Sequence, residues 1–234
     1  MTDAAPATTL ARAGSSVGEV ALRRRGAHTE LVVGGVFVMD TVDVSTEVAL
    51  ATVALGRHDA PRRVLIGGLG LGFTATAVLA DQRVEEVLVV EIAEPLIDWA
   101  GAGLLPTDLV DPRIHLRAGD VVEVLTATPG EWDLILLDVD NGPGFLVRED
   151  NARLYGPAGL SSAVAALAPS GVLAIWSSHP APELLAALDS IEGGTAQEVL
   201  RRVSREGRDL TYGIYLLEAA AQADADLVQH HPRE

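Results

Sequence analysis

Four short apolar runs of this sequence each end at a glycine-rich turn or an acidic side chain. The run 64–66 is followed by the turn GGLGLG (67–72), and the next three runs end at Glu91, Asp120 and Asp138. Carboxylates accept hydrogen bonds from hydroxyl and amino groups, and glycine lets the backbone approach a ligand closely. If the runs are parallel strands, all four positions lie beyond their carboxyl ends, where ligands bind in open α/β sheets. The pattern therefore predicts one ligand site.

The acids after the second and third runs suit different parts of a nucleoside. Glu91 lies about twenty residues past the glycine turn, the spacing at which an acid accepts hydrogen bonds from ribose hydroxyls. Asp120, in the segment AGD, could accept a hydrogen bond from an adenine amino group. Each has a simpler alternative, because Glu91 could be a solvated acid at a strand end and Asp120 could be the N-cap of a following helix.

The fourth run leads into LLDVDNGP (136–143). Asp138 and Asp140 could bind a cation, bind a protonated amine, or act as a general base, with Asn141 beside them. The alternative is a plain turn, because Asp-Asn-Gly-Pro is strong turn chemistry. We expect no metal, since Mg²⁺ usually takes substrate phosphates as well and no phosphate-binding pattern is present.

The elements that position these residues alternate between strands and helices. Strands are predicted at 64–66, 83–92, 112–116, 132–138 and 171–176, and helices at 47–55, 73–80, 95–102, 121–126, 157–167 and 182–191. This alternation predicts an α/β fold, a Rossmann-like doubly wound sheet that is mostly parallel. Segments 199–204 and 211–217 should add a C-terminal antiparallel hairpin. We expect a disordered leader (1–16), a small N-terminal β-hairpin unit (17–46), a nucleoside-binding catalytic domain (47–220) and a tail (221–234).

Composition excludes several classes of function. A net charge of −16 argues against a nucleic-acid partner, which needs clustered cations. No apolar run approaches the roughly 18 residues of a membrane span, and the N-terminal residues lack a secretory pattern, so we expect a cytoplasmic protein. The chain has no cysteine and no lysine, which removes thiolate and Schiff-base chemistry. The hydrophobic share of 48% is compatible with a buried subunit contact and a homodimer or higher homo-oligomer.

Together these motifs resemble the spermidine synthase-like branch of the class I S-adenosylmethionine-dependent methyltransferase superfamily. The resemblance is carried by VFVMDTVDVSTE, VLIGGLGLG, VVEI, DPRIHLRAGD, DLILLDVDNGP and LYGPAGL followed by APSGVLAIW. It implies S-adenosylmethionine or its decarboxylated form as co-substrate. It also implies roles by position. The tail of this nucleoside would lie beside Gly68, Leu69, Gly70 and Gly72, the ribose at Glu91 and Ile92, adenine at Asp120 and Val121, and the reacting centre at Asp138.

The chain departs from the family pattern at several places. In aminopropyltransferases the glycine turn resembles GGGDGG, and its acid holds a cationic amine. This chain has Leu71 at the place of that acid. Their Tyr-His-Glu segment is replaced by VALATVAL (48–55), and Asp43 stands where they have a Gln. Asp43, Asp140, Asn141 and Tyr155 are the candidate substrate-binding residues.

These residues predict a transferase that moves a methyl or aminopropyl group to a small amine acceptor, with Asp138 or Asp140 taking the proton. Two alternatives stay open. One is a non-catalytic protein that keeps the fold to bind a nucleoside or a partner. The other is an NAD-dependent oxidoreductase, because residues 70–75 match G-x-G-x-x-A.

Overall fold

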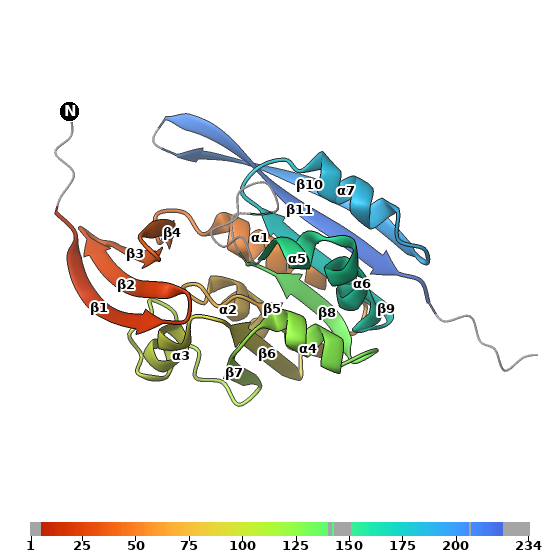
Figure 1. Ribbon diagram of the computed structural model, residues 1–234, viewed down its shortest axis with the longest axis horizontal. Helices are drawn as coiled ribbons and strands as arrows, with labels where there is room; N and C mark the ends of the chain where they lie inside the picture. The colour runs from red at the N-terminus through yellow and green to blue at the C-terminus, as the bar shows by residue number, and fades with distance from the viewer. Residues whose placement is uncertain (1–5, 140–141, 143–150, 206, 222–234) are drawn as a thin grey trace, which may run out of the picture.

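A seven-stranded, mostly parallel sheet forms the centre of the molecule (Figure 1). The computed structural model describes residues 6–139, 142, 151–205 and 207–221. In spatial order the strands are β10 (Gly194–Arg205), β11 (Arg208–Ala219), β9 (Leu167–Ser177), β8 (Trp132–Leu137), β5 (Arg63–Gly67), β6 (Glu86–Glu91) and β7 (Ile114–Ala118). β11 pairs antiparallel with both of its neighbours. The predicted Rossmann-like sheet with a C-terminal antiparallel hairpin is confirmed.

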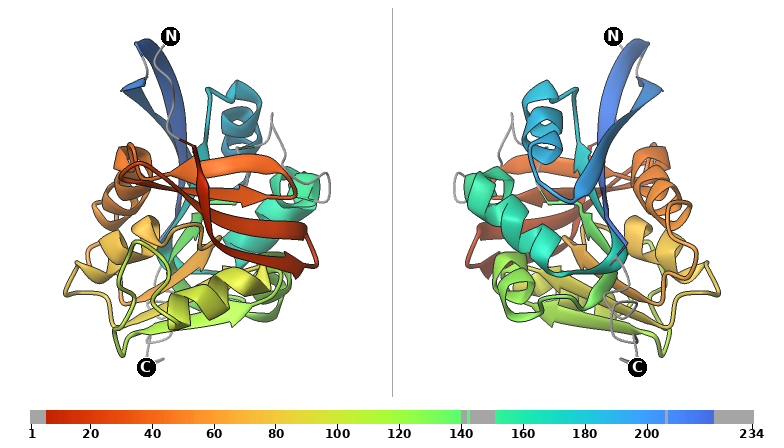
Figure 2. Two further views of the ribbon diagram at one scale, coloured as in Figure 1. Left: turned by 90° about the vertical axis from the view of Figure 1, so that its left-hand side faces the viewer. Right: turned by 90° about the vertical axis from the view of Figure 1, so that its right-hand side faces the viewer.

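Helices cover both faces of this sheet (Figure 2). One face carries α1 (Ser45–Leu55), α2 (Phe73–Leu79) and α3 (Glu94–Gly101). The other carries α4 (Val121–Ala127), α5 (Ala152–Tyr155), α6 (Pro157–Ala165) and α7 (Pro182–Asp189). The short helix α5 lies in a stretch that the sequence pattern left as a connection, because four residues show no helical period. None of the described helices is long and apolar enough to cross a membrane.

A separate four-stranded antiparallel sheet precedes the main sheet. It is a meander of β1 (Thr8–Ser15), β2 (Gly18–Arg25), β3 (His28–Val33) and β4 (Val36–Asp40). The expectation of a disordered leader over 1–16 was wrong for β1, which pairs with β2 from Thr8 to Ser15. The small polar residues of β1 carry little strand signal of their own, and the partner strand supplies the hydrogen bonds that order them. Residues 222–234 of the predicted tail lie outside the described part.

The chain order reverses between β5 and β8. β6 and β7 follow β5 on one side, whereas β8 pairs with its other side. The Asp138 N–H donates a hydrogen bond of 2.8 Å to the Gly67 carbonyl oxygen, which joins the ends of the two strands. Ligands in open α/β sheets bind at such a switch point. The topology therefore places the glycine turn and Asp138 side by side.

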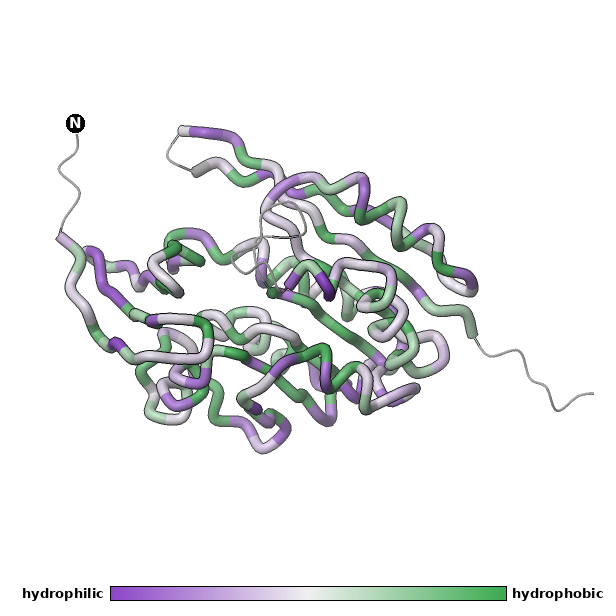
Figure 3. The backbone as a smooth tube through the Cα atoms, in the orientation of Figure 1, coloured by the Kyte–Doolittle hydropathy of each residue, from purple (hydrophilic) through white to green (hydrophobic). Residues whose placement is uncertain are grey.

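Two apolar layers, one on each face of the sheet, hold the helices in place. The strand residues alternate between them: Leu134 and Leu136 pack toward α1 and α2, and Ile135 and Leu137 pack toward α4 to α6. Figure 3 shows the resulting hydrophobic track along β8. Val20, Leu22 and Leu31 of the small sheet belong to the first layer, so the two sheets share one core.

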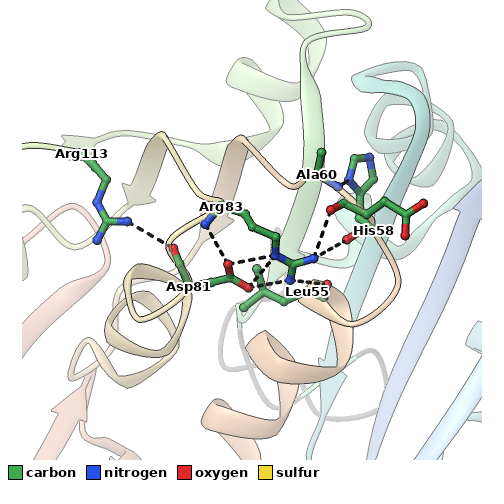
Figure 4. A network of polar contacts seen from close by, with 7 residues as sticks. Leu55, His58, Ala60, Asp81, Arg83 and Arg113 are labelled. Atoms are coloured by element: carbon green, nitrogen blue, oxygen red, sulfur yellow. Dashed lines mark hydrogen bonds and ion pairs between the residues drawn. The ribbon is translucent and has the colours of Figure 1, made fainter.

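An arginine network closes the opposite end of the main sheet, where the parallel strands begin (Figure 4). The Arg83 guanidinium donates to the carbonyl oxygens of Leu55 and His58 and pairs with Asp81 at 2.6 Å. Arg113 donates to the Asp81 carbonyl oxygen. These bonds tie the end of α1 to the segments before β6 and β7. Polar contacts within the chain therefore stabilise this end of the sheet.

Candidate active site at the switch point

A pocket opens at the carboxyl ends of β5, β6, β7 and β8. Seven of the predicted positions line it: Gly68, Gly70, Glu91, Ile92, Asp120, Val121 and Asp138. One apolar wall comes from the small sheet and its β1–β2 turn, through Val17, Leu31, Val33 and Val38. The Ser16 hydroxyl donates to the Ile92 carbonyl oxygen, so the β1–β2 turn is attached to the rim of the main sheet. The small sheet therefore forms one side of the site, a contribution that the sequence analysis did not predict.

At two of its glycines, the glycine turn approaches neighbouring residues so closely that a side chain would not fit. Gly68 has φ +92°, and a Cβ there would lie 2.2 Å from the Asp138 carbonyl oxygen. Gly72 has φ +88° and precedes α2, where a Cβ would meet the Thr107 hydroxyl. Gly68 and Gly70 line the pocket, whereas Leu69 and Gly72 lie outside its lining. The turn thus offers two of the four predicted ligand-facing positions.

Glu91 is buried, with 8% of its surface exposed, and it braces this turn. Its Oε2 accepts from the Leu69 N–H at 2.7 Å and its Oε1 accepts from the Ala93 N–H at 2.8 Å. Burial raises the pKa of Glu91, and the backbone hydrogen bonds oppose that shift. The N–H groups of Gly70 and Ile92 act on the carboxylate as well, so Glu91 fixes the backbone of the glycine turn to the end of β6. The alternative of a solvated acid is wrong, and the ribose contact at Glu91 and Ile92 stays a prediction.

Asp120 is the N-cap of α4, which was the simpler of the two roles that the sequence allowed for it. Its Oδ1 accepts from the Val122 N–H at 2.9 Å, and its Oδ2 forms an ion pair with Arg153 of α5. Asp120, Val121 and Arg153 all line the pocket. The cap does not use up the carboxylate, so contact with a nucleobase stays a prediction for Asp120 and Val121.

Asp138 directly follows β8 and lines the pocket. Its Oδ2 accepts from the Thr74 hydroxyl at 2.7 Å. Burial raises the pKa of Asp138 to about 7, the negative charges of Glu47 and Glu91 add to the rise, and the Thr74 hydrogen bond opposes it. A carboxylate with a pKa near neutrality can take and release protons at physiological pH. The general-base role of Asp138 therefore stays a prediction, to which this pKa is suited.

Comparisons with known proteins identify the family of this chain. Residues 44–202 match the model of the family described as Spermine/spermidine synthase domain, which is more than half of the chain. The chain belongs to this family. Spermidine synthase of Dictyostelium discoideum is 31% identical over 152 residues, covering 60% of this chain and 51% of the relative. Polyamine aminopropyltransferase of Thermococcus onnurineus is 39% identical over 83 residues, covering 35% and 29%.

A methyltransferase is also among the relatives, and solved structures share the fold. Putrescine N-methyltransferase 4 of Nicotiana tabacum is 34% identical over 87 residues, covering 36% of this chain and 22% of the relative. A crystal structure of spermidine synthase in complex with the transition state analogue AdoDATO superposes with TM-score 0.77 at 18% identity, covering 90% of this chain and 73% of that one. The chain spans about half, or less, of the length of the curated relatives it matches.

The structure shows which residues of the glycine turn face the pocket. Leu71 is fully buried in the core beside α2, so its side chain does not face the pocket. Gly68 and Gly70 are the positions of the turn that line the pocket, and a Cβ at Gly70 would lie 2.9 Å from the Met39 sulfur. The replacement of an acid by Leu71 stays a prediction, but the Leu71 side chain lies in the core and not in the pocket. The turn still brings no carboxylate into the pocket.

One acid of α1 that was not among the predicted site residues acts on Asp138 through its charge, although it is not part of the pocket lining. Glu47 lies in the first turn of α1, immediately before residues 48–55, and its charge acts on Asp138. Thr46 Oγ1 donates to Glu47 Oε2 at 2.7 Å. The sequence analysis missed Glu47 because it counted only acids that follow strands.

The remaining predicted substrate-binding residues have other contacts. Asp43 Oδ1 accepts from the Ser45 N–H at the start of α1, and the Tyr155 hydroxyl donates to the Val139 carbonyl oxygen at 2.6 Å. Neither side chain is part of the pocket lining. Tyr155 instead fixes the backbone next to Asp138. Asp140 and Asn141 lie outside the described residues.

Proposed function

We propose that this chain transfers an alkyl group from a nucleoside sulfonium, S-adenosylmethionine or its decarboxylated form, to a small amine. Aminopropyl transfer is the first candidate, as in the family to which the chain belongs. The observation that carries the proposal is the position of Asp138. Its carboxylate has a pKa of about 7 and lies at the switch point, in one pocket with Gly68 and Glu91.

The sulfonium supplies its own activation, so the protein has to bind, align and move one proton. The nitrogen lone pair of the acceptor forms the new N–C bond as the S–C bond breaks, and the electron pair of that bond stays on sulfur. Asp138 accepts the proton that the amine loses. Glu47 and Asp138 together place negative charge where a cationic amine would approach. Pairing with a cation would in turn favour the ionised form of Asp138.

The pocket lining suits the rest of a nucleoside. Glu91 would accept from ribose hydroxyls, and its contacts to Leu69 and Ala93 hold the carboxylate in place for that purpose. Apolar side chains of Ile92, Val121 and Leu154 line the part of the pocket near Asp120, where a planar base would be enclosed. Asp120 would accept from the exocyclic amino group.

Methyl transfer is a second candidate, favoured by the glycine turn. Gly70 contributes no carboxylate to the pocket, so a donor whose tail carries a carboxylate meets no repulsion from this position. A putrescine N-methyltransferase among the relatives has the corresponding chemistry in its name. The oxidoreductase alternative has no observation in its favour beyond the G-x-G-x-x-A match.

Calorimetry and turnover separate these candidates. The protein is titrated with S-adenosylmethionine, its decarboxylated form and 5′-methylthioadenosine, and product formation with a panel of diamines is followed by mass spectrometry. We expect one donor to bind and to give an alkylated amine. Asp138→Asn should lower turnover by roughly 10²- to 10⁴-fold, the usual contribution of a general base. Glu85→Gln, at a mostly exposed acid paired with Arg62, is the matched control.

The outcomes are distinct. Binding of none of the three nucleosides would overturn the proposal. Binding without turnover on any amine would favour the alternative of a non-catalytic nucleoside-binding protein.

We further propose a homo-oligomer, supported by the exposed apolar side chains Phe37 and Val42, which are 43% and 51% exposed. Light scattering after size exclusion tests that assembly, and a monomer would contradict it.

A further inference from the structure

Asp120 and Arg153 form an ion pair at one end of the pocket. Asp120 precedes α4, and Arg153 belongs to α5, 33 residues later in the chain. Both side chains line the pocket. Because the pair joins two elements across the pocket rim, it presents a negative and a positive group side by side to whatever binds there.

Neither group is used up by the pair. Asp120 Oδ1 accepts one backbone N–H and Oδ2 accepts from Arg153, and each carboxylate oxygen can accept a second hydrogen bond. The guanidinium carries five N–H donors in a fixed plane, most of which are free of Asp120. The Arg153 side chain is 56% exposed, so it can change its position without disturbing the core. The end of the pocket thus holds an acceptor and a donor together.

We propose that Arg153 is a specificity-determining residue that lets this pocket accept purines with either an amino or an oxo group at position 6. The inference rests on the proposed function, which places the base beside Asp120. A carboxylate alone accepts a hydrogen bond from a 6-amino group. On a 6-oxopurine the neighbouring donor is the ring N1–H, and against the 6-oxo oxygen itself the carboxylate only sets one acceptor beside another. Such an unpaired contact supports strong rejection of the wrong base. Arg153 supplies the missing donor, so the discrimination falls.

The test measures binding of 5′-methylthioadenosine and 5′-methylthioinosine by calorimetry. In the wild-type protein we expect the two dissociation constants to lie within about tenfold of each other. Arg153→Met keeps much of the side-chain volume and removes the donors. The variant should weaken the binding of 5′-methylthioinosine by about tenfold or more relative to the binding of 5′-methylthioadenosine. Arg62→Met is the matched control, because Arg62 pairs with Glu85 where the strands begin and both side chains are mostly exposed.

A second variant tests the same contact from the other side. Asp120→Asn keeps an N-cap, since asparagine is as good a cap as aspartate, and its amide adds a donor. It should shift the preference toward 5′-methylthioinosine.

The outcomes separate the inference from the proposed function. An unchanged ratio in Arg153→Met, or an equal loss of both nucleosides, would overturn the role of Arg153 while leaving nucleoside binding intact. Failure of the wild-type protein to bind either nucleoside would overturn the proposed function, and this inference with it.

Discussion

The Thr74 hydroxyl donates a hydrogen bond of 2.7 Å to Asp138 Oδ2, which links the first turn of α2 to the end of β8. Thr74 is buried, with 3% of its surface exposed, so the bond is shielded from water. It stabilises the ionised form of Asp138 against the effects of burial and of Glu47. The two residues are 64 positions apart in the chain. The balance of burial, the charges of Glu47 and Glu91 and this hydrogen bond sets the proton affinity of the candidate base.

Removing this hydrogen bond should weaken the base near neutral pH. Thr74→Val keeps the shape of the side chain and deletes the hydroxyl, so the pKa of Asp138 should rise further. We expect turnover at pH 6.5 to fall roughly three- to tenfold, the effect of about 1 kcal/mol, and to recover at high pH. Thr74→Ser retains the hydroxyl and should restore the wild-type profile. Equal profiles for the valine and serine variants would show that the bond has no part in setting the pKa.

The rate should follow the ionisation of Asp138. With a pKa of about 7, the ionised fraction rises about tenfold between pH 6 and pH 8, and kcat should rise with it. The measurement is a pH profile of kcat at saturating amine. A rate that is flat over this interval would exclude Asp138 as the base in the rate-limiting step.

Glu47→Gln should move that profile in the opposite direction from Thr74→Val. Removing the negative charge of Glu47 lowers the pKa of Asp138, so the rising limb of kcat should shift to lower pH. The loss of charge should also raise KM for a cationic amine, by roughly threefold to tenfold at low salt. Titration of the amine itself is the same in all variants, so a shift between them belongs to the enzyme. Glu85→Gln is again the control.

Stability should depend on pH through the same carboxyl group. Because the folded state raises the pKa of Asp138 above its usual 3.8, the stability it contributes is fully present below pH 3.8 and is lost as the pH rises through about 7. Asp138→Asn removes this dependence. The melting temperature of the variant relative to wild type should therefore increase from pH 4 to pH 8. Asp108→Asn, at an exposed residue away from the pocket, is the control for the Asp-to-Asn substitution itself.

A side chain at Gly68 should disrupt the turn. Gly68→Ala adds a Cβ at 2.2 Å from a backbone oxygen in a left-handed conformation, so the strand ends must move apart. We expect a loss of roughly 3 kcal/mol in the free energy of unfolding. Gly26→Ala is the matched control, because Gly26 also has a positive φ, +60°, but nothing lies within 4 Å of its Cβ position. It should cost only about 1 kcal/mol. Chemical denaturation measures both, and equal losses would show that the close approach is unimportant.

The features that could be predicted from the sequence are those with a local signal. The run 64–66, the glycines and α2 form a strand, a turn and a helix within about fifteen residues, and the acids at Glu91, Asp120 and Asp138 follow their own strands directly. Strands and helices that alternate along the chain also impose the parallel sheet. The strand β1 escaped prediction, because its polar residues gain their order from pairing with β2.

By itself, the sequence determined the sheet, its glycine corner and the acids at its rim, since each depends on the period and spacing of neighbouring residues. Tertiary structure alone decided that Gly70 rather than Leu71 faces the pocket, and that Glu47 and Thr74 act on Asp138. It also decided that Arg153 pairs with Asp120. These relations join residues far apart in the chain, and they depend on burial and distance, which come into being only when the helices pack on the sheet.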